Sequence, residues 1–380
     1  MLKIDEITAY PLSFPVSAGA SVRLGIGRTI KRDTVLVRVR TDDGLVGWGE
    51  AHPGRAPGSI AHLIQTTLAG LVRGLEASDV VGVWERIYKM QLSSHGMGAA
   101  AAMAMSGIDM ALWDIRAKAV GWPLYRLLGG RARSVPAYAG GISLGFQPAG
   151  DLVAEAQGMV QRGFRAIKLR VGDTWQADIE RVRAVREALG EDIEILVDAN
   201  TSYSLADVRR VMPVFDALGV GWLEEPFPPH DAHSYRMAAG FGITPLAAGE
   251  NHYTRFEFQR LIEDASVSIL QPDLSKTGGI TEALRIAAMA SARKLPIHPH
   301  TSATGLNMAA SIHFLASVDN GGYFEADTAL ENRFRDELTS KSFEVGADGC
   351  VTPLEGPGIG IEVNEDFIRA HPVIEGPGYV

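Results

Sequence analysis

The pattern of apolar and polar positions changes once along the chain, near residue 130. Before this point, alternation typical of β-strands covers residues 4–14, 34–40 and 45–50. Asp42-Asp43-Gly44 predicts a hairpin turn between the last two runs. Residues 58–128 then carry the apolar spacing of helices. Because strands and helices come in separate blocks, residues 1–130 are predicted to form an α+β unit.

After residue 130, short β-rich runs alternate with helical periodicity. The eight runs lie at residues 135–140, 166–171, 193–198, 220–225, 244–250, 267–273, 295–300 and 321–325. Such alternation predicts an α/β fold over residues 131–350, a parallel (β/α)8-type barrel. Residues 351–380 become extended again, and we expect them to leave the barrel and rejoin the first unit.

Composition and net charge exclude some classes of binding partner and of structural site. The chain has 380 residues and a formal net charge of −9, which disfavours nucleic acid and anionic membrane surfaces. Its one cysteine, Cys350, excludes an intrachain disulfide framework and a multi-cysteine zinc site. The N-terminus lacks the apolar run of a signal peptide, and no apolar stretch is long enough to span a bilayer. We therefore expect a cytoplasmic protein.

Carboxylates end three consecutive predicted strands of the barrel. Asp198, Glu224 and Glu250 follow one another at intervals of 26 residues, one βα unit each. Because successive parallel strands return to the same rim, these side chains should converge at the C-terminal face, where barrel active sites lie. Three converging anions repel one another unless a cation lies between them. Hard carboxylate oxygens that leave coordination positions open suit Mg²⁺.

Basic residues and an acid–histidine pair end the neighbouring strands. Lys168 and Arg170 share one face of the second barrel strand, because side chains alternate along a strand. Asp273 ends the sixth strand and His300 the seventh, 27 residues later, so Asp273 could orient the imidazole and raise its basicity. Glu325 ends the eighth strand. Lys168 and Arg170 are expected to face His300 across a bound substrate.

Together these residues favour removal of a proton α to a carboxylate. That proton is too weakly acidic for an unaided histidine, so a metal ion must stabilise the ene-diolate that forms. Taken singly, each strand-end carboxylate could instead be a helix N-cap or a solvated charge, and the two cations could serve only as its ion-pair partners. The regular spacing favours the functional interpretation.

Several short segments carry a more specific signature. They are Gly-Trp-Gly-Glu at 47–50, Gly-Ile-Asp-Met-Ala-Leu-Trp-Asp at 107–114, Leu-Leu-Gly-Gly at 127–130, Val-Asp-Ala-Asn at 197–200, Trp-Leu-Glu-Glu-Pro at 222–226, Gly-Glu-Asn at 249–251, Gln-Pro-Asp at 271–273 and Gly-Pro-Gly-Ile-Gly at 356–360. Over essentially its whole length the chain resembles the enolase superfamily, in the mandelate racemase/muconate lactonizing enzyme group, and its acid-sugar dehydratases in particular. The resemblance implies a modified, TIM-like barrel with an N-terminal α+β capping domain that the C-terminal segment completes.

The resemblance also implies roles for the strand-end residues. The three carboxylates spaced by 26 residues match the family's Mg²⁺ ligands. Asp273 and His300 match its His–Asp dyad, and Glu325 matches the acid that hydrogen-bonds the substrate carboxylate. Lys168 matches the first lysine of a Lys-x-Lys strand. These assignments agree with the ones reached from the spacing.

Arg170 departs from the family pattern, which has a second lysine acting as a base at this position. Arginine is essentially always protonated and makes a poor base. The substitution favours chemistry run by His300, namely dehydration of an aldonate or aldarate to a 2-keto-3-deoxy acid. Racemisation or epimerisation stays open, because Lys168 could act as a base. A cycloisomerase acting on a sugar-acid lactone or an anhydro-sugar acid would use the same proton abstraction.

The substrate is expected to be a small sugar acid or hydroxy acid, and the resemblance implies a homo-oligomer such as an octamer. It also implies that residues 16–31 and the segment around His52 close over the barrel mouth. Basic residues of these segments could receive a distal carboxylate or hydroxyls: Arg23, Arg28, Lys31 and Arg55. Asn200, Lys276 and Tyr138 are further candidates for substrate binding. The alternatives are a solvated basic loop and ordinary packing.

Two rival functions come from other classes. Residues 141–145 match the G-x-S-x-G motif around Ser143, and Asp273 and His300 follow in the chain order of an α/β-hydrolase triad. With 42 glycines in the chain such a match arises easily by chance, and a serine hydrolase leaves the carboxylate spacing unexplained. A non-catalytic sugar-acid-binding protein would not need the complete set of strand-end residues.

Overall fold

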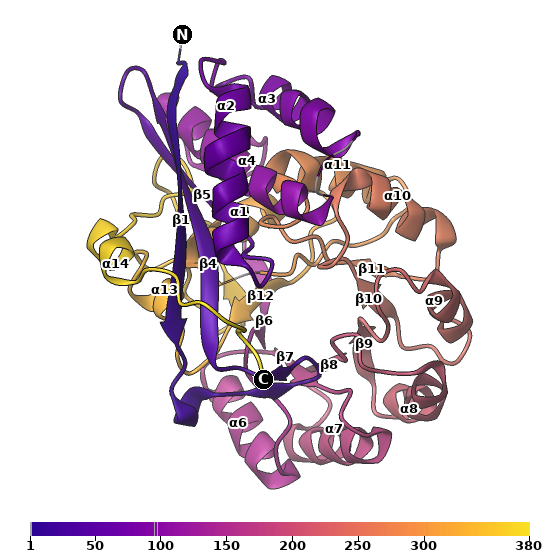
Figure 1. The fold of residues 1–380 in the computed structure, drawn as a ribbon. Helices are drawn as coiled ribbons and strands as arrows, with labels where there is room; N and C mark the ends of the chain where they lie inside the picture. The colour runs from indigo at the N-terminus through magenta and orange to yellow at the C-terminus, as the bar shows by residue number, and fades with distance from the viewer. Residues whose placement is uncertain (1, 95, 97, 302) are drawn as a thin grey trace.

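The fold combines an N-terminal α+β capping domain with a parallel barrel of the modified TIM type (Figure 1). It is given by a computed structural model that describes residues 2–94, 96, 98–301 and 303–380. The predicted fold class is confirmed. In the part of the chain that is described, no helix combines the length and the apolar character that crossing a membrane requires.

The capping domain is built on a three-stranded antiparallel sheet in the order β1-β4-β5. Its strands are β1 Ile4–Pro15, β4 Lys31–Thr41 and β5 Val46–Ala51, and a small hairpin of β2 Arg23–Leu24 and β3 Gly27–Arg28 precedes β4. Its helices are α1 Pro57–Leu63, η2 Ile64–Leu68, α2 Ala69–Val72, α3 Val80–Ile87, η3 Tyr88–Leu92, α4 Ala99–Ala119 and α5 Leu124–Leu127. A short turn of helix, η1 Ala18–Ala20, lies in the loop after β1.

Helix α4 lies directly on strand β5, and glycines make this close approach possible. A Cβ atom on Gly49 would lie 2.1 Å from the carbonyl oxygen of Gly107 on α4. Any larger residue at either position would force the helix away from the sheet. The sequence Gly-Trp-Gly-Glu at 47–50 therefore has a packing reason, and Glu50 faces the barrel, where its carboxylate accepts from the Thr304 backbone N–H at 3.2 Å.

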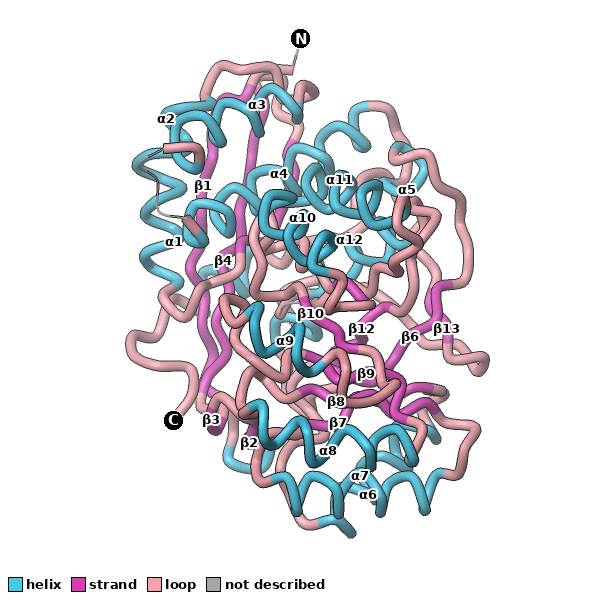
Figure 2. The backbone as a smooth tube through the Cα atoms, turned by 90° about the vertical axis from the view of Figure 1, so that its right-hand side faces the viewer, coloured by secondary structure: helices cyan, strands magenta, loops and turns pink. Residues whose placement is uncertain are grey.

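The barrel strands run parallel in the order β11-β10-β9-β8-β7-β6-β12. They are β6 Val135–Gly140, β7 Ala166–Arg170, β8 Glu194–Asp198, β9 Val220–Glu224, β10 Leu246–Ala248, β11 Ile269–Leu270 and β12 Phe324–Asp327. The helices between and after them are α6 Ala149–Gln161, α7 Trp175–Leu189, α8 Leu205–Ala217, α9 Ala232–Ala238, α10 Thr254–Asp264, α11 Gly279–Ser291, α12 Gly305–Leu315 and α13 Arg333–Asp336. Figure 2 shows the strands inside and helices around them.

Four of the predicted barrel strands differ from the structure, and those expected at 244–250 and 267–273 are present but shorter, as β10 and β11. The expected strand at 295–300 is reduced to single bridges that Ile297 forms with Leu270 and Gly321. Pro296 and Pro299 explain this, since neither can donate a ladder hydrogen bond. The last barrel strand, β12, continues to Asp327 rather than ending at Glu325.

The barrel interior is filled below the C-terminal rim. A buried cluster of inward side chains closes it: Tyr138, Ala166, Leu196, Trp222, Ala247 and Ile269. Tyr138 and Trp222 meet edge to face with ring centroids 5.5 Å apart. Polar side chains at the rim therefore stand above a solid floor rather than above a channel.

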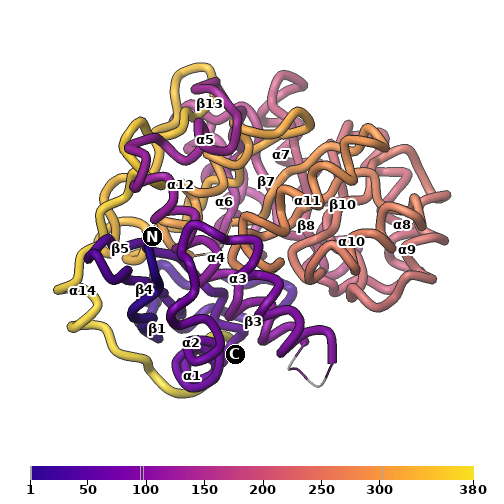
Figure 3. The backbone as a smooth tube through the Cα atoms, turned by 90° about the horizontal axis from the view of Figure 1, so that it is seen from above, coloured from indigo at the N-terminus to yellow at the C-terminus, as the bar shows by residue number. Residues whose placement is uncertain are grey.

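The C-terminal segment runs back along the capping domain, as Figure 3 shows. Strand β13 Cys350–Val351 pairs with β6, and helix α14 Glu365–Ala370 follows. Isolated bridges then join Gly358 to Pro123, Pro372 to Leu12 and Tyr379 to Thr29. The predicted domain boundaries, 1–130, 131–350 and 351–380, stay predictions.

Asp114 on α4 holds three parts of the chain together. Its carboxylate accepts hydrogen bonds from the Trp48 backbone N–H at 3.0 Å, the Ile359 backbone N–H at 2.9 Å and the Lys118 ammonium at 2.6 Å. The side chain is 2% exposed, so water cannot replace it. One carboxylate thus joins α4, β5 and the returning C-terminal segment.

We predict that Asp114→Ala lowers the free energy of unfolding by about 3 kcal/mol, because two buried backbone N–H groups lose their acceptor. Asp114→Asn should cost less, since its amide oxygen can still accept one of these bonds. Urea unfolding of the wild type and both variants measures the difference. Equal stability of Asp114→Ala and the wild type would contradict this role.

Candidate active site

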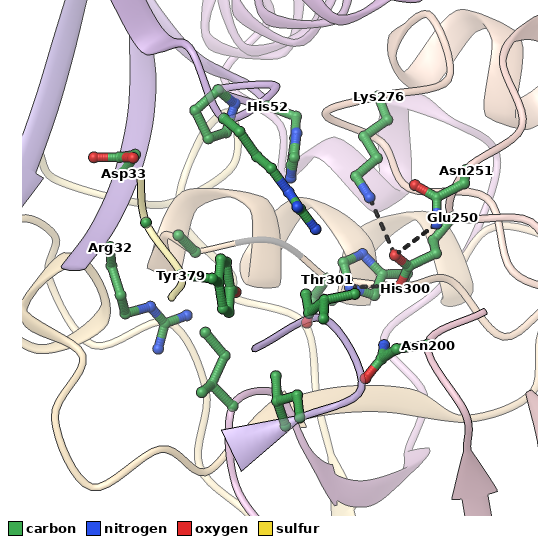
Figure 4. A pocket seen from close by; sticks show the side chains of 18 of the residues that line it. Arg32, Asp33, His52, Asn200, Glu250, Asn251, Lys276, His300, Thr301 and Tyr379 are labelled. Carbon is green, nitrogen blue, oxygen red and sulfur yellow. Dashed lines mark hydrogen bonds and ion pairs between the residues drawn. The ribbon is translucent and has the colours of Figure 1, made fainter. Parts of the chain in front are cut away.

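A cavity of about 280 Å³ lies at the C-terminal rim of the barrel, under the capping domain. Figure 4 shows it from close by. The barrel contributes Arg170, Asn200, Glu225, Glu250, Lys276 and His300 to its lining. The capping domain and the C-terminal tail contribute Arg32, Asp33, His52, Arg55 and Tyr379. The volume is near the lower end of the range for small-molecule sites.

Lys168 on β7 is surrounded by carboxylates at the base of the site. Its Nζ lies 2.8 Å from Glu224 Oε1, 2.9 Å from Glu325 Oε1 and 3.6 Å from Asp198 Oδ2. Burial alone would lower the pKa of Lys168, but Glu224 and Glu325 outweigh it and hold that pKa well above its usual range. Lys168 is therefore a fixed cation in this structure.

Arg170, two residues further along β7, pairs with Asp198 on β8. One guanidinium nitrogen donates to the Asp198 carboxylate and lies 3.3 Å from Asn200 Oδ1, and the other donates to the Gly141 carbonyl. The second Asp198 oxygen accepts from the Asn200 backbone N–H at 2.8 Å. The guanidinium is thus held between two strand ends and lines the cavity as a permanent positive charge.

The adjacent residues Glu224 and Glu225 have different surroundings. Glu224 ends β9 inside the barrel, where its Oε2 accepts from Trp222 Nε1 at 3.1 Å and Gln271 Nε2 at 2.7 Å. Burial and the neighbouring carboxylates raise the pKa of Glu224 to about 7, against the opposing effect of Lys168. Glu225 has a left-handed backbone, with φ of 36°, and lines the cavity. Its Oε2 accepts from Asn251 Nδ2 at 2.8 Å.

His300 lies between two carboxylates. Its Nδ1 is 2.6 Å from Asp273 Oδ2, and its Nε2 is 3.0 Å from Glu250 Oε2. Burial would lower the pKa of His300, but Glu250, Glu325 and the hydrogen bond to Asp273 raise it to about 9. The predicted Asp–His pair is present in this geometry, and the ring directs Nε2 toward the carboxylates of the rim.

Asp273 is itself fixed by several donors. Its Oδ1 accepts from the Ser275 backbone N–H and hydroxyl, both at 2.7 Å, and from Asn307 Nδ2 at 3.2 Å. Although burial would raise the pKa of Asp273, the hydrogen bond and charge of His300 hold it below its usual range. An ionised Asp273 keeps the Nδ1 proton and leaves Nε2 to act.

Glu325 lies on β12, and β7, which carries Lys168, stands between β12 and the Glu224 strand β9 in the sheet order. Its Oε1 accepts from the Gly141 backbone N–H at 3.1 Å, and its Oε2 accepts from the Thr301 backbone N–H at 3.2 Å. Lys168 and His300 lower the pKa of Glu325 to about 2, against the effect of burial. The side chain is fully buried and therefore held in one orientation.

The cavity is lined by most, but not all, of the residues predicted to bind substrate. Asn200, Lys276, His52, Lys31 and Arg55 line it, and Arg23, Arg28 and Tyr138 do not. Lys276 Nζ is 3.3 Å from Glu250 Oε1. Tyr138 lies in the barrel floor, because it is two residues below the end of β6. The Arg23 side chain is 56% exposed and faces Asp173 at 3.6 Å rather than the cavity.

Other lining residues were not singled out from the sequence. They are Arg32, Asp33, Glu225, Asn251, Thr301, Asp327 and Tyr379. In the sequence, the doublet Glu224-Glu225 could have pointed to Glu225, and the alternation Glu325-Ala326-Asp327 could have pointed to Asp327. Arg32 and Tyr379 reach the cavity through contacts between the two ends of the chain, which no local pattern reveals.

The G-x-S-x-G segment does not form a nucleophile–base pair in this structure. The Ser143 hydroxyl donates to the Gly140 carbonyl at 2.8 Å and lies 2.8 Å from Thr328 Oγ1. Both ring nitrogens of His300 face carboxylates instead. The geometry therefore gives no support to a serine hydrolase.

The charges of the site fit a divalent cation. Six carboxylates lie in this part of the described chain, Asp198, Glu224, Glu225, Glu250, Asp273 and Glu325, beside the cations Lys168, Arg170, Lys276 and His300. The described residues hold no group of three or more His, Cys, Asp or Glu side chains already placed around one point, because lysine, arginine and histidine pair with the candidate ligands. The carboxyl groups outnumber these cations by two, and burial beside other carboxylates raises the pKa of both Glu224 and Glu225. A divalent cation would offset that repulsion, and hard oxygen ligands suit Mg²⁺.

Comparison with known proteins gives two family matches that together cover most of the chain. Residues 12–129 match the mandelate racemase/muconate lactonizing enzyme N-terminal domain, and residues 151–367 match the enolase C-terminal domain-like family. The chain is 35% identical to D-galactarolactone cycloisomerase of Agrobacterium fabrum, over 89% of this chain and 91% of that one. It is 33% identical to arabinonate dehydratase of Saccharolobus solfataricus, over 89% and 90%.

Solved structures agree with these matches. A member of the enolase superfamily from Polaromonas sp. JS666 is 56% identical, with a TM-score of 0.97 over all of both chains. A racemase from Streptomyces coelicolor with bound magnesium is 28% identical, with a TM-score of 0.89 over 97% of this chain and 100% of that one. Relatives of this chain are thus enzymes, and at least one holds magnesium. The chain belongs to the enolase superfamily, in the mandelate racemase/muconate lactonizing enzyme group.

Proposed function

We propose that this enzyme dehydrates a sugar acid, an aldonate or aldarate, to a 2-keto-3-deoxy acid, in a Mg²⁺-dependent reaction that starts with removal of the proton α to the carboxylate. The observation that carries the proposal is the His300–Asp273 pair, 2.6 Å apart, beside the rim carboxylates. A base held by a buried carboxylate next to a cation site is the arrangement that α-proton abstraction requires. Relatives that are sugar-acid dehydratases support the choice of reaction.

His300 is proposed as the base. Glu250 is among the groups that raise the pKa of His300 in this structure, so a bound cation that takes up the charge of Glu250 would favour the neutral ring. Asp273 holds Nδ1, so Nε2 of the neutral ring takes the α-proton of the substrate, and the electron pair of that C–H bond moves into the ene-diolate. As the ene-diolate collapses, the bond from the β-carbon to its hydroxyl breaks. The imidazolium of His300 returns its proton to this leaving hydroxyl, which departs as water, and the remaining enol tautomerises to the 2-keto-3-deoxy acid. No other reactant is needed.

Asp198, Glu224 and Glu250 are proposed to hold the metal ion. When bound, Mg²⁺ would supply positive charge that stabilises the ene-diolate and lowers the barrier to its formation. The ammonium of Lys168 adds positive charge at the base of the site, 2.9 Å from Glu325. Glu325, which accepts from two backbone N–H groups, is placed to hydrogen-bond the reacting carboxylate. Asn200 and Lys276, which line the same cavity, would orient the substrate hydroxyls.

Lys168 and Arg170 are proposed to bind charge rather than to move protons. Arg170 stands where racemases of the family have a basic lysine, and a guanidinium does not give up its proton. Lys168 is engaged by three carboxylates. A single base on one face of the substrate favours elimination over racemisation.

The second candidate is a cycloisomerase. D-galactarolactone cycloisomerase and 3,6-anhydro-α-L-galactonate cycloisomerase are 35% and 32% identical to this chain. Such a reaction would start with the same proton abstraction by His300 and differ in the bond that breaks. The leaving group, a ring oxygen rather than a free hydroxyl, separates the two reactions.

We predict that His300→Asn lowers the rate of α-proton exchange and of turnover by about 10³-fold or more, because the base is lost. Proton NMR in D₂O with a panel of sugar acids and Mg²⁺ measures both, and dehydration gives a new methylene signal at C3. His62→Asn, on the exposed face of α1, is the matched control and should keep full activity. Turnover by His300→Asn near the wild-type rate would remove the base assignment.

A single base predicts stereospecific exchange. The wild-type enzyme should exchange the α-proton of one C2 epimer of a substrate pair and should not interconvert the two. The same NMR experiment, started separately from each epimer, measures this. Exchange from both epimers, or the appearance of one from the other, would show a second base and favour racemase chemistry.

We predict that EDTA abolishes α-proton exchange and that Mg²⁺ restores it, because an ene-diolate needs charge that the chain alone does not supply. Glu250→Gln should weaken the response to Mg²⁺ at least about tenfold, since it removes one hard ligand charge. Glu187→Gln, on the exposed side of α7, is the control. Full activity after thorough metal removal would rule out the proposed mechanism.

A further inference from the structure

The cavity has a second cationic region, away from the candidate metal ligands. In Figure 4, Arg32 and Tyr379 lie on the side of the cavity opposite to Lys276, Glu250 and His300. Arg55 also lines this cavity from the capping domain. The proposed reaction uses none of these three side chains.

The guanidinium of Arg32, on β4, has N–H groups that make no hydrogen bond to the described residues. Its Nη2 lies 2.6 Å from Asp327 Oδ2, while its Nη1 is buried and has no hydrogen-bond partner among the described residues. Asp327 does not depend on Arg32 alone, because it also accepts from Asn332 Nδ2 at 2.9 Å and from the Ala329 backbone N–H at 2.8 Å. The Arg32 side chain is 7% exposed. An unpartnered, buried guanidinium N–H at a cavity is costly unless a ligand accepts from it.

Arg55 carries a charge that the described part of the chain does not neutralise by an ion pair. It follows β5 in a left-handed backbone conformation, with φ of 62°, and its guanidinium lies 5.4 Å from the centre of the Tyr379 ring. The ring thus orients the cation from one side. By contrast, Lys31 and Asp33, which also line the cavity, neutralise each other at 3.0 Å.

Tyr379, the penultimate residue, is fixed in the wall by the β3 hairpin. The Arg28 backbone N–H donates to the Val380 carbonyl at 2.7 Å, and the Val380 N–H donates to the Arg28 carbonyl at 3.0 Å. This pairing holds the ring against Arg55, and no partner of the phenol hydroxyl is found among the described residues. The hydroxyl is therefore available to donate to a ligand.

We propose that Arg32, Arg55 and Tyr379 bind the distal carboxylate of the substrate, so that the enzyme acts on sugar diacids (aldarates) in preference to the matching monoacids. Two guanidinium groups and a phenol hydroxyl supply the planar, multiple donors that a carboxylate accepts. The inference rests on the proposed function, which places the reacting carboxylate at the opposite end of the cavity. The tail of the chain is then part of the specificity site.

A terminal phosphate offers similar chemistry, so the test uses substrates in sets of three. Each set has an aldonate, the aldarate of the same configuration and the aldonate 6-phosphate, assayed with Mg²⁺ by proton NMR. We expect kcat/KM for the aldarate to exceed that for the aldonate at least about tenfold, as charge-assisted hydrogen bonds predict. Equal values, or a preference for the phosphate, would overturn the assignment.

Variants test which side chains cause the preference for the aldarate. Arg55→Met should raise KM for the aldarate about tenfold while kcat and the KM for the aldonate change little, and Tyr379→Phe should do the same to a smaller extent. Arg183→Met, which removes a positive charge from the exposed face of α7, is the control and should change neither KM. Equal effects of Arg55→Met on the aldarate and the aldonate would contradict a distal carboxylate site.

A binding measurement separates this inference from the proposed function. Calorimetry on His300→Asn and on His300→Asn/Arg55→Met compares the affinities for aldarate and aldonate without turnover. Tighter binding of the aldarate that depends on Arg55 supports the distal site even if no acid in the panel exchanges its α-proton. Turnover of aldonates, with no aldarate preference in binding, would remove the distal site and leave the proposed function standing.

Discussion

Repulsion among buried carboxylates is the constraint on which this candidate active site depends. Asp198, Glu224 and Glu325 lie around the ammonium of Lys168, which is within 3.6 Å of all three. Without such cations the carboxylates would have to take up protons or move apart, since burial disfavours their charged form. The ion pairs therefore fix the rim of the barrel as much as they prepare it for chemistry.

The same repulsion explains why the basic residues of the site differ in their pairing with carboxylates. Lys168 and Arg170 are engaged by carboxylates and act as fixed charges, while His300 has one nitrogen held by Asp273 and the other directed toward Glu250. The capping domain completes the cavity from above with Arg32, and the C-terminal tail contributes a side wall. A site assembled in this way joins residues from the barrel, the capping domain and the last residues of the chain.

The sequence predicted the rim well, because the relevant patterns are local. Period-two alternation and one βα unit of spacing were enough to bring Lys168 and the strand-end carboxylates to one place. The apolar pattern alone could not reveal that Pro296 and Pro299 reduce the seventh strand to single bridges. Tyr138 lies in the barrel floor rather than in the cavity, because β6 continues for two residues beyond it. The tail residue Tyr379 could not be foreseen, since its position depends on pairing with residues some 350 positions earlier.

Carboxyl groups outnumber the cations at the rim, and we propose that a divalent cation balances their charge. The most direct measurement is a calorimetric titration of Mg²⁺ into metal-stripped protein, followed by thermal unfolding with and without the ion. We expect one Mg²⁺ bound per chain and a higher unfolding temperature in its presence. Absence of binding, with unfolding unchanged by millimolar Mg²⁺, would contradict it.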